Sequence, residues 1–265
     1  MYEIGVMTSS LGIENPIEAV KKAKELGFTK VQLTGLTAID EQLPHSYLSS
    51  SKAELADFLK TNDMRVSSLS LKYCKGEDPR RWLWRANEYI KFASEMNVGL
   101  VTGHIGKIES GASRQLAHQM KKTASYCKDK NVYFGIETGT ESPWDLIGFI
   151  CSVEGRDTDP RIVINFDPAN FLIYGTLEAD EILDSIPMFK SMIGQVHVKD
   201  AVPGKEVSLG EGSVNIKDYI LALQKIGYNG PLVLETGGAQ AEKLAKIKNG
   251  KIFLENILKE IELNR

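Results

Sequence analysis

Short apolar runs rich in β-branched residues alternate with longer amphipathic segments along the whole chain. The expected strands cover residues 3–8, 30–35, 64–73, 98–106, 132–139, 161–167, 193–200 and 230–238. Apolar residues at helical spacing predict helices over residues 16–27, 50–63, 78–97, 113–131, 142–153, 178–190, 215–230 and 240–263. Pro187 is expected to break the helix over residues 178–190, because proline lacks the backbone N–H of a helix interior.

This order of elements predicts parallel strands joined by right-handed crossovers. Eight strand–helix units in a chain of 265 residues predict an α/β fold of the closed (β/α)8 TIM barrel type. Glycines and prolines lie at element boundaries and no linker is visible, so we expect one domain over residues 1–265. An open doubly wound sheet is the alternative, although it usually has fewer units.

Composition narrows the classes of partner. The net charge is −3 and no long block of Lys and Arg occurs, so nucleic acid is not an expected partner. The three cysteines form no CxxC pair, which is typical of a reducing compartment and favours the cytoplasm. The N-terminus lacks the basic start and apolar run of a signal peptide, and no stretch reaches the ~18 apolar residues of a membrane span. We therefore expect a cytoplasmic protein that does not bind membranes.

Ligand-type side chains follow the last four expected strands. Asp167 comes directly after the apolar run at 162–166 and directly before Pro168, which ends the strand. Taken alone, Asp167 is equally well explained as a turn aspartate that caps the next segment. The corresponding residues of the neighbouring strands are Glu137, His197 and Glu235, and the four are separated by 30, 30 and 38 residues. Because the carboxyl ends of all barrel strands meet at one face, we expect these four side chains to converge.

Three converging carboxylates repel one another unless a cation compensates, and one histidine cannot neutralise them. Three oxygen ligands and one imidazole suit a divalent metal, with Mn²⁺ first and Mg²⁺, Co²⁺ or Zn²⁺ as alternatives. The competing interpretation is a set of separate hydrogen-bonded strand ends. We interpret Asp167 as a metal ligand together with Glu137, His197 and Glu235.

A family resemblance rests on four stretches of the second half. GIETGTESPWDL, INFDPANFLIYG, VHVKD and SLGEGSVNIKDYILALQKIGYNGPLVLET together resemble the xylose-isomerase-like TIM barrel superfamily. Within it they are similar to the sugar phosphate isomerase/epimerase group, which includes ketose 3-epimerases and hydroxypyruvate-isomerase-like proteins. The resemblance is dense over about residues 132–237 and weaker in the N-terminal half. It implies one divalent metal, often Mn²⁺, bound by Glu137, Asp167, His197 and Glu235.

The resemblance also implies catalytic roles for Glu137 and Glu235. In the epimerases, one such glutamate removes a proton beside the ketone and the other delivers one to the opposite face. A metal on the carbonyl and hydroxyl oxygens stabilises the developing enediolate. Return of the proton to the neighbouring carbon would give isomerisation, and loss of a β-hydroxyl would give dehydration. The sequence leaves these three outcomes open, and the lyase alternative is a dehydratase of a keto-polyol such as a keto-inositol.

Three positions depart from the epimerase pattern. Asn170 stands where many epimerases have His, and Thr236 follows Glu235 where many have Arg. Glu141 lies near, but not at, the usual place of a second acidic residue. These departures weaken the assignment to ketose 3-epimerases but leave the metal site intact.

Three further residues are expected to bind the substrate. His104 ends the fourth strand, Lys199 alternates with His197, and Asn170 can hydrogen-bond a hydroxyl. The expected partner is a small carbohydrate, phosphorylated or not, and a homo-oligomer is expected by analogy. Endonuclease IV shares the superfamily, but it uses a His-rich zinc cluster and this chain has four His in all. A non-catalytic sugar-binding barrel is the remaining alternative, although the presence of both glutamates favours an enzyme.

Overall fold

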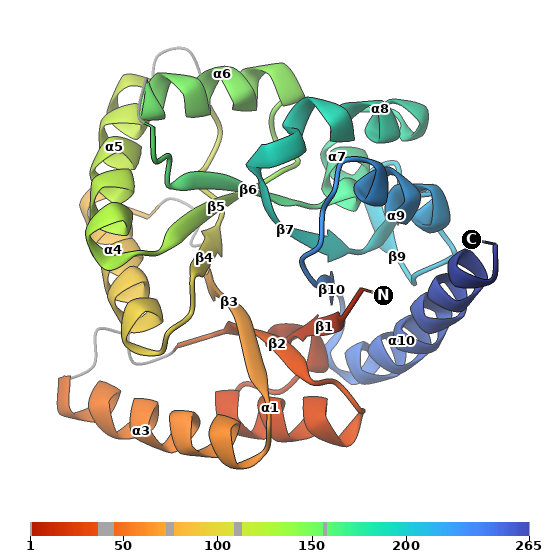
Figure 1. Ribbon diagram of the computed structural model, residues 1–265, viewed down its shortest axis with the longest axis horizontal. Coiled ribbons are helices and arrows are strands. Elements are labelled where there is room, and N and C mark those ends of the chain that lie inside the picture. Colours follow the sequence, from red (N-terminus) through yellow and green to blue (C-terminus); the bar gives the residue numbers. More distant parts are fainter. Residues whose placement is uncertain (1, 37–44, 73–76, 109–112, 156–157, 265) are drawn as a thin grey trace.

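The computed structural model describes residues 2–36, 45–72, 77–108, 113–155 and 158–264. Eight parallel strands of this part of the chain close into a barrel in the order β1-β10-β7-β6-β5-β4-β3-β2 (Figure 1). Their bounds are β1 Ile4–Met7, β2 Lys30–Thr34, β3 Arg65–Leu71, β4 Leu100–Gly103, β5 Tyr133–Glu137, β6 Ile162–Phe166, β7 Ile193–Val198 and β10 Leu232–Leu234. Each strand lies within an apolar run of the sequence, and the (β/α)8 barrel is confirmed.

Helices surround the barrel and cover the outer faces of its strands (Figure 1). They are α1 Pro16–Glu25, α3 His45–Thr61, α4 Pro79–Glu95, α5 Ser113–Lys130, α6 Pro143–Glu154, α8 Ala179–Phe189, α9 Ile216–Lys225 and α10 Gln240–Leu263. Asn15, Asp78 and Ser142 cap their helices by accepting backbone N–H groups, directly before a proline in each case. None of the helices within the described ranges is both long and apolar enough to cross a membrane.

Two predicted helix features were wrong. Pro187 does not break its helix, because α8 continues through it to Phe189. Pro187 lies in the last turn, so the missing N–H and the ring disturb only the helix end. The helix α3 begins at His45, earlier than the expected residue 50, although it ends close to the expected position.

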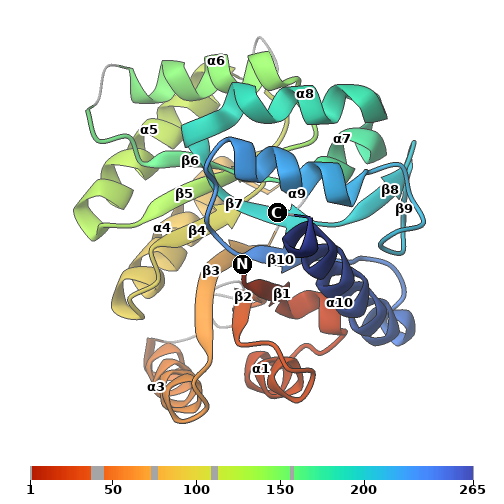
Figure 2. The ribbon, with the colours of Figure 1, turned by 45° about the vertical axis from the view of Figure 1, so that its right-hand side comes forward.

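Two short insertions at the carboxyl end of the barrel were not predicted. The helix α7, Pro168–Tyr174, follows β6 directly. The strands β8, Asp200–Val202, and β9, Lys205–Val207, form an antiparallel hairpin after β7. The hairpin lies beside α7 (Figure 2), and its Gly204 N–H donates to the Leu172 carbonyl oxygen at 3.0 Å. Both insertions therefore build the face of the barrel where the expected site lies.

A buried polar layer crosses the barrel interior beneath that face. The Gln32 amide donates to Thr102 Oγ1 at 2.8 Å, and Ser68 donates to Gln195 Oε1 at 2.8 Å. Gln195 in turn donates to Asn165 Oδ1 at 3.3 Å. These five side chains are at most 1% exposed, so hydrogen bonds replace the water that they lost on folding. Because they come from five strands, they hold the strands in register below the site.

Candidate metal centre

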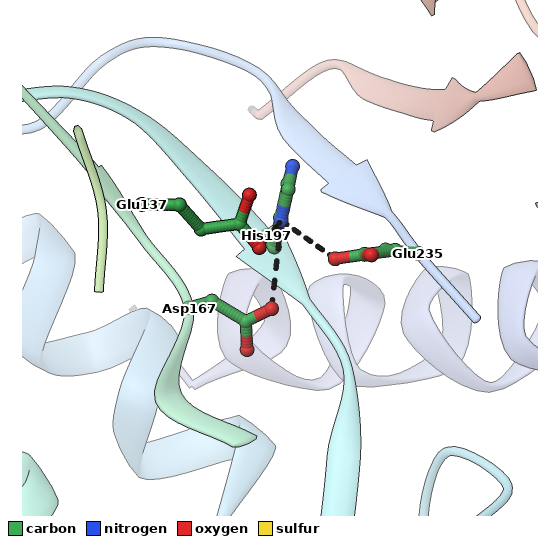
Figure 3. A group of neighbouring side chains, drawn as sticks. All are labelled: Glu137, Asp167, His197 and Glu235. Atoms are coloured by element: carbon green, nitrogen blue, oxygen red, sulfur yellow. Dashed lines mark ion pairs between the residues drawn. The ribbon is translucent and has the colours of Figure 1, made fainter. Parts of the chain in front are cut away.

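The four ligand-type residues predicted from the strand ends converge in the structure. One ligand atom from each of Glu137, Asp167, His197 and Glu235 lies within 4.8 Å of the others. Glu137 is the last residue of β5, Asp167 and Glu235 follow β6 and β10, and His197 belongs to β7. In Figure 3, Glu137 and Glu235 approach His197 from opposite sides and Asp167 lies below it. The barrel topology thus brings together residues spread over a hundred positions of the chain.

Asp167 is both a helix cap and a member of this cluster. Its Oδ1 atom accepts the N–H groups of Ala169 at 3.0 Å and Asn170 at 3.3 Å, at the N-terminus of α7. Its backbone N–H donates to Thr138 Oγ1 at 2.8 Å, and the same hydroxyl donates to the Asp167 carbonyl at 3.1 Å. The two interpretations of this residue are therefore compatible. Capping orients the carboxylate so that Oδ2 faces the cluster.

His197 is oriented by the polar layer beneath it. Its Nε2 atom lies 2.8 Å from Gln32 Oε1 and 3.2 Å from the Asn165 amide nitrogen. Because the Gln32 amide group donates to Thr102, its oxygen faces the imidazole and accepts the Nε2–H. In the neutral ring, Nδ1 then carries the free lone pair. A neutral imidazole ligates a metal through the nitrogen that carries this lone pair.

The atoms that face the centre of the cluster are of the types that ligate a metal ion. His197 Nδ1 lies 2.7 Å from Glu235 Oε2, 3.5 Å from Asp167 Oδ2 and 3.7 Å from Glu137 Oε1. Among the described residues, both Asp167 Oδ2 and His197 Nδ1 are buried atoms that make no hydrogen bond. Each of the two atoms faces a charged group instead: the Lys199 ammonium lies 2.7 Å from Asp167 Oδ2, and Glu235 Oε2 lies 2.7 Å from His197 Nδ1. Three carboxylate oxygens and one imidazole nitrogen fit a divalent metal such as Mn²⁺, Mg²⁺ or Zn²⁺.

Lys199 supplies part of the positive charge. Its ammonium lies 2.7 Å from Asp167 Oδ2 and 3.2 Å from Glu235 Oε2, and the residue is 5% exposed. Burial opposes the charged form, but the charges of Asp167, Glu235 and Glu137 outweigh it and hold the pKa of Lys199 well above its usual range. A divalent ion and this ammonium together offset the three carboxylates when His197 is neutral. The sequence pattern had indicated compensation by the metal alone.

The carboxylates of the two glutamates are held ionised. Burial would raise the pKa of Glu137, but the neighbouring His104, together with His197 and Lys199, lowers it to about 2. Burial likewise opposes ionisation of Glu235, and the charges of Lys199 and His197 lower its pKa to about 2. Without a metal, the same carboxylates raise the pKa of His197 well above its usual value despite burial. The surrounding carboxylates therefore favour a positive charge at Nδ1, which a proton or a metal ion can supply.

The three residues expected to bind substrate all lie beside the cluster. His104 follows β4, and its Nε2 is 3.5 Å from Glu137 Oε2. Asn170 donates to Glu137 Oε1 and to the Thr138 carbonyl oxygen, both at 3.1 Å. The Asn170 amide group is thus directed at Glu137 and orients it. Contact of His104, Asn170 and Lys199 with a substrate remains a prediction.

Three residues near the cluster, Glu141, Tyr174 and Gln32, were given no functional role from the sequence. Glu141 accepts the Ile108 N–H at 3.0 Å and thereby anchors the loop after His104. Tyr174, at the end of α7, is 52% exposed, and burial together with the charges of the cluster raises the pKa of its phenol. Its ring is therefore an open aromatic surface near the site, whereas Phe171 of the same helix is fully buried. Gln32 also went unassigned, although a glutamine between Val31 and Leu33 was a visible signal.

Comparisons with known proteins agree with the barrel fold. A family model described as "Xylose isomerase-like TIM barrel" matches residues 20–257. A xylose isomerase domain protein from Planctomyces limnophilus is 22% identical, with a TM-score of 0.81 and 99% of both chains covered. An L-ribulose 3-epimerase is 16% identical, with a TM-score of 0.78 and 99% of this chain and 98% of the other covered.

A third similar structure carries a different activity in its name. The probable 3-DHS dehydratase AsbF from Bacillus anthracis is 16% identical, with a TM-score of 0.72 and 95% of this chain and 98% of the other covered. No curated protein matches the sequence significantly. At these identities the solved structures show only that the fold is shared. The family model matches residues 20–257, which is most of the chain.

Proposed function

Because the chain belongs to the xylose isomerase-like TIM barrel family, we propose that it is a divalent-metal-dependent isomerase or epimerase of a small sugar. The observation that carries the proposal is the convergence of Glu137, Asp167, His197 and Glu235 at the carboxyl end of the barrel. Manganese as the metal and the cytoplasm as the location belong to the same proposal. They are supported by the oxygen-rich ligand set and by the cysteine usage.

The two glutamates are the proposed acid and base. They approach the cluster from opposite sides (Figure 3), so a sugar between them would meet a carboxylate on each face of its reacting carbon. In the reacting complex one glutamate is a carboxylate and removes the proton from the carbon beside the carbonyl, while the other has taken a proton from water and delivers it to the opposite face. This exchange inverts the configuration of that carbon. Asn170 and His104 hold Glu137 in place for its part of the transfer.

A bound divalent ion supplies Lewis-acid stabilisation of the negative charge that develops on the substrate oxygens. Glu137, Asp167, His197 and Glu235 would hold it. Lys199 holds a proton within hydrogen-bond distance of Asp167 and Glu235, so it offsets their charge and can donate to a substrate oxygen. Gln32 keeps His197 in the tautomer that ligates through Nδ1.

A dehydratase of a keto-polyol is the second candidate. It is favoured by the resemblance to the probable dehydratase AsbF and by the chemistry, because loss of the same proton precedes both reactions. The two candidates differ in the step after proton removal. An epimerase returns the proton to carbon, whereas a dehydratase expels a hydroxyl from the next carbon.

The test is deuterium uptake in heavy water. The protein, supplied with Mn²⁺, is incubated with ketoses, ketose phosphates and keto-inositols, and products are read by NMR. We expect deuterium at the carbon beside the carbonyl of one substrate class, and loss of uptake by at least 100-fold in Glu137→Gln and Glu235→Gln. Glu262→Gln, at an exposed position of α10, is the matched control. Uptake that persists unchanged in both site variants would contradict the proposal, and water loss without uptake at a retained carbon would favour the dehydratase.

A further inference from the structure

The loops after the seventh and eighth strands of an α/β barrel commonly bind phosphate through backbone N–H groups and a helix N-terminus. In this chain these strands are β7 and β10. The loop over residues 208–215 is glycine-rich and leads into α9, so its composition is typical of such a site. In the structure, N–H groups of this loop donate to a carboxylate of the chain itself.

The carboxylate of Asp200 occupies the centre of this loop. Its Oδ1 accepts the N–H groups of Ala201 at 2.9 Å and Val214 at 3.1 Å, and its Oδ2 accepts those of Gly210 and Gly212, both at 2.9 Å. Asp200 is 1% exposed. A Cβ atom on Gly212 would lie 2.1 Å from Asp200 Oδ1, so the loop is wrapped tightly around the carboxylate. The chain's own anion therefore takes the place and the donors that a phosphate would use.

A second carboxylate accepts hydrogen bonds from the loop after β10. Glu206, from the β8–β9 hairpin, accepts the Gly237 N–H at 2.6 Å and the Thr236 hydroxyl at 2.7 Å through its Oε1 atom. A Cβ atom on Gly237 would lie 2.9 Å from Glu206 Oε2. Thr236 directly follows Glu235, so Glu206 places a negative charge in the loop that begins one residue after a member of the cluster.

The helix N-termini that follow these loops also carry acidic side chains. At α9, Asn215 accepts the Asp218 N–H at 3.1 Å and its amide donates to the Asp218 carboxylate at 2.6 Å. At α10, Glu242 lies in the first turn, 3.5 Å from the Lys246 ammonium. A phosphate at the N-terminus of α9 or α10 would lie close to a carboxylate that already interacts with the positive end of the helix dipole.

The charge of the candidate site leads to the same conclusion. A divalent ion and Lys199 together offset the three carboxylates, so the loaded site carries no excess positive charge for a phosphate dianion. Such a dianion close to Asp200 and Glu206 would be repelled by both. A sugar hydroxyl carries no charge and meets no such repulsion.

We propose that the site takes an uncharged polyhydroxy ketone, and that the carboxylates of Asp200 and Glu206 exclude its phosphorylated form. This inference rests on the proposed function and defines its substrate class. Asp200 fills the loop after β7 that would bind the phosphate, and Glu206 engages the loop after β10.

The test compares matched pairs, such as D-fructose with D-fructose 6-phosphate and D-ribulose with D-ribulose 5-phosphate. Binding is followed by saturation-transfer NMR and reaction by deuterium uptake, both with the Mg²⁺-loaded protein. We expect the uncharged member to bind and exchange at least tenfold better than its phosphate. Equal or better performance of a phosphorylated member would overturn the inference and still support the proposed function. Failure of every member to bind or exchange would count against the proposed function and, with it, the inference.

A variant tests whether Glu206 contributes to the preference for the uncharged sugar over its phosphate. Glu206→Gln removes the negative charge, while its amide oxygen can still accept the bonds from Thr236 and Gly237. We expect the preference for the uncharged member to narrow by about two- to fivefold. A ratio that does not change would overturn the role given to Glu206.

A further experiment, a titration with inorganic phosphate, does not require the sugar substrate to be known. Inorganic phosphate is titrated into the metal-free protein at constant ionic strength, and its ³¹P linewidth is followed. We expect no saturable binding up to about 10 mM, because the loop N–H groups are engaged. Saturable binding in the submillimolar range that is lost on Gly212→Ala would overturn the inference directly.

Discussion

Gln32 Oε1 lies 2.8 Å from His197 Nε2, although the two residues are 165 positions apart. Both side chains are fully buried, and Gln32 is itself fixed by its hydrogen bond to Thr102. The contact sets the imidazole tautomer, so that Nδ1 faces three carboxylates with a free lone pair. We therefore expect metal binding by the cluster to depend on a residue of β2 that contacts the other nitrogen of the imidazole.

Replacement of Gln32 by methionine is expected to weaken metal binding. Methionine fills a similar volume but cannot accept the Nε2–H, so the ring loses the partner that fixes its tautomer and orientation. We expect Mn²⁺ affinity, measured by isothermal titration calorimetry, to fall by about 10- to 100-fold. Gln195→Met is the matched control, because Gln195 belongs to the same buried layer but bonds to Ser68 and Asn165. Equal losses of affinity in both variants would show that the layer as a whole, and not the contact to His197, matters.

Substitution of Gly212 by alanine is expected to destabilise the fold. The added methyl group would lie 2.1 Å from Asp200 Oδ1, so the loop must shift and release hydrogen bonds to a buried carboxylate. The expected loss is about 1–3 kcal/mol of the free energy of unfolding, measured by urea denaturation. At Gly99 an added Cβ meets nothing within 4 Å, so Gly99→Ala serves as the control. Similar stability of the two variants would argue against the tightly wrapped loop.

Glu3 ties the amino-terminal ends of three strands together, and its contribution should depend on pH. It accepts a bond from Thr29 at 2.9 Å, lies 2.7 Å from the Lys30 ammonium and pairs with Arg65. Partial burial raises the pKa of Glu3, but the bonds from Lys30 and Thr29 and the charges of Lys30 and Arg65 outweigh it and lower the pKa. A lowered pKa means that the carboxylate stabilises the fold above the ordinary glutamate pKa, and that this contribution disappears as the pH falls through the lowered value.

Glu3→Gln should therefore cost about 0.5–1 kcal/mol at pH 7 and progressively less on acidification. The measurement is urea denaturation of both proteins between pH 7 and pH 3. Glu14→Gln, at an exposed position, is the control. A destabilisation by Glu3→Gln that grows as the pH falls would have the wrong sign for this account.

The two described cysteines should differ in reactivity. Cys127 is fully buried, and burial together with the Glu154 charge raises its thiol pKa to about 12, whereas Cys151 is exposed. Because the thiolate is the reactive form, iodoacetamide at pH 8 should alkylate Cys151 and spare Cys127 until the protein is unfolded. Peptide mass spectrometry measures both. Native labelling of Cys127 as fast as Cys151 would contradict the packing described around α5. Cys74 lies outside the described residues.

The barrel could be predicted because strand and helix periods alternate eight times. The expected helix over residues 240–263 coincides with α10, and every barrel strand falls within its expected run. The hairpin β8–β9 was missed because each strand has three residues and its second strand, Lys205–Val207, lacks the apolar alternation of a core strand. Helix α7 was missed because it has only seven residues and begins at Pro168, which was interpreted only as the end of the strand.

The convergence of Glu137, Asp167, His197 and Glu235 could be predicted because strand topology alone brings strand ends to one face. The side chains that orient these four residues could not, because their contacts depend on three-dimensional packing. Gln32 and His197 meet across the barrel interior, and Glu206 reaches Gly237 from a hairpin that the sequence did not reveal. Lys199 was expected to face the barrel mouth, but its two ion pairs with Asp167 and Glu235 required the structure.

The central claim is that Glu137, Asp167, His197 and Glu235 form a metal centre. The most direct measurement is the divalent metal content of the purified protein after Mn²⁺ loading and desalting, by elemental analysis, beside Asp167→Asn. Asp57→Asn, at an exposed position of α3, is the control. The account predicts about one ion per chain in the wild type and the control, and at least tenfold weaker retention in Asp167→Asn. A wild type that retains no Mn²⁺, Mg²⁺, Co²⁺ or Zn²⁺, or an Asp167→Asn variant that retains as much as the wild type, would contradict it.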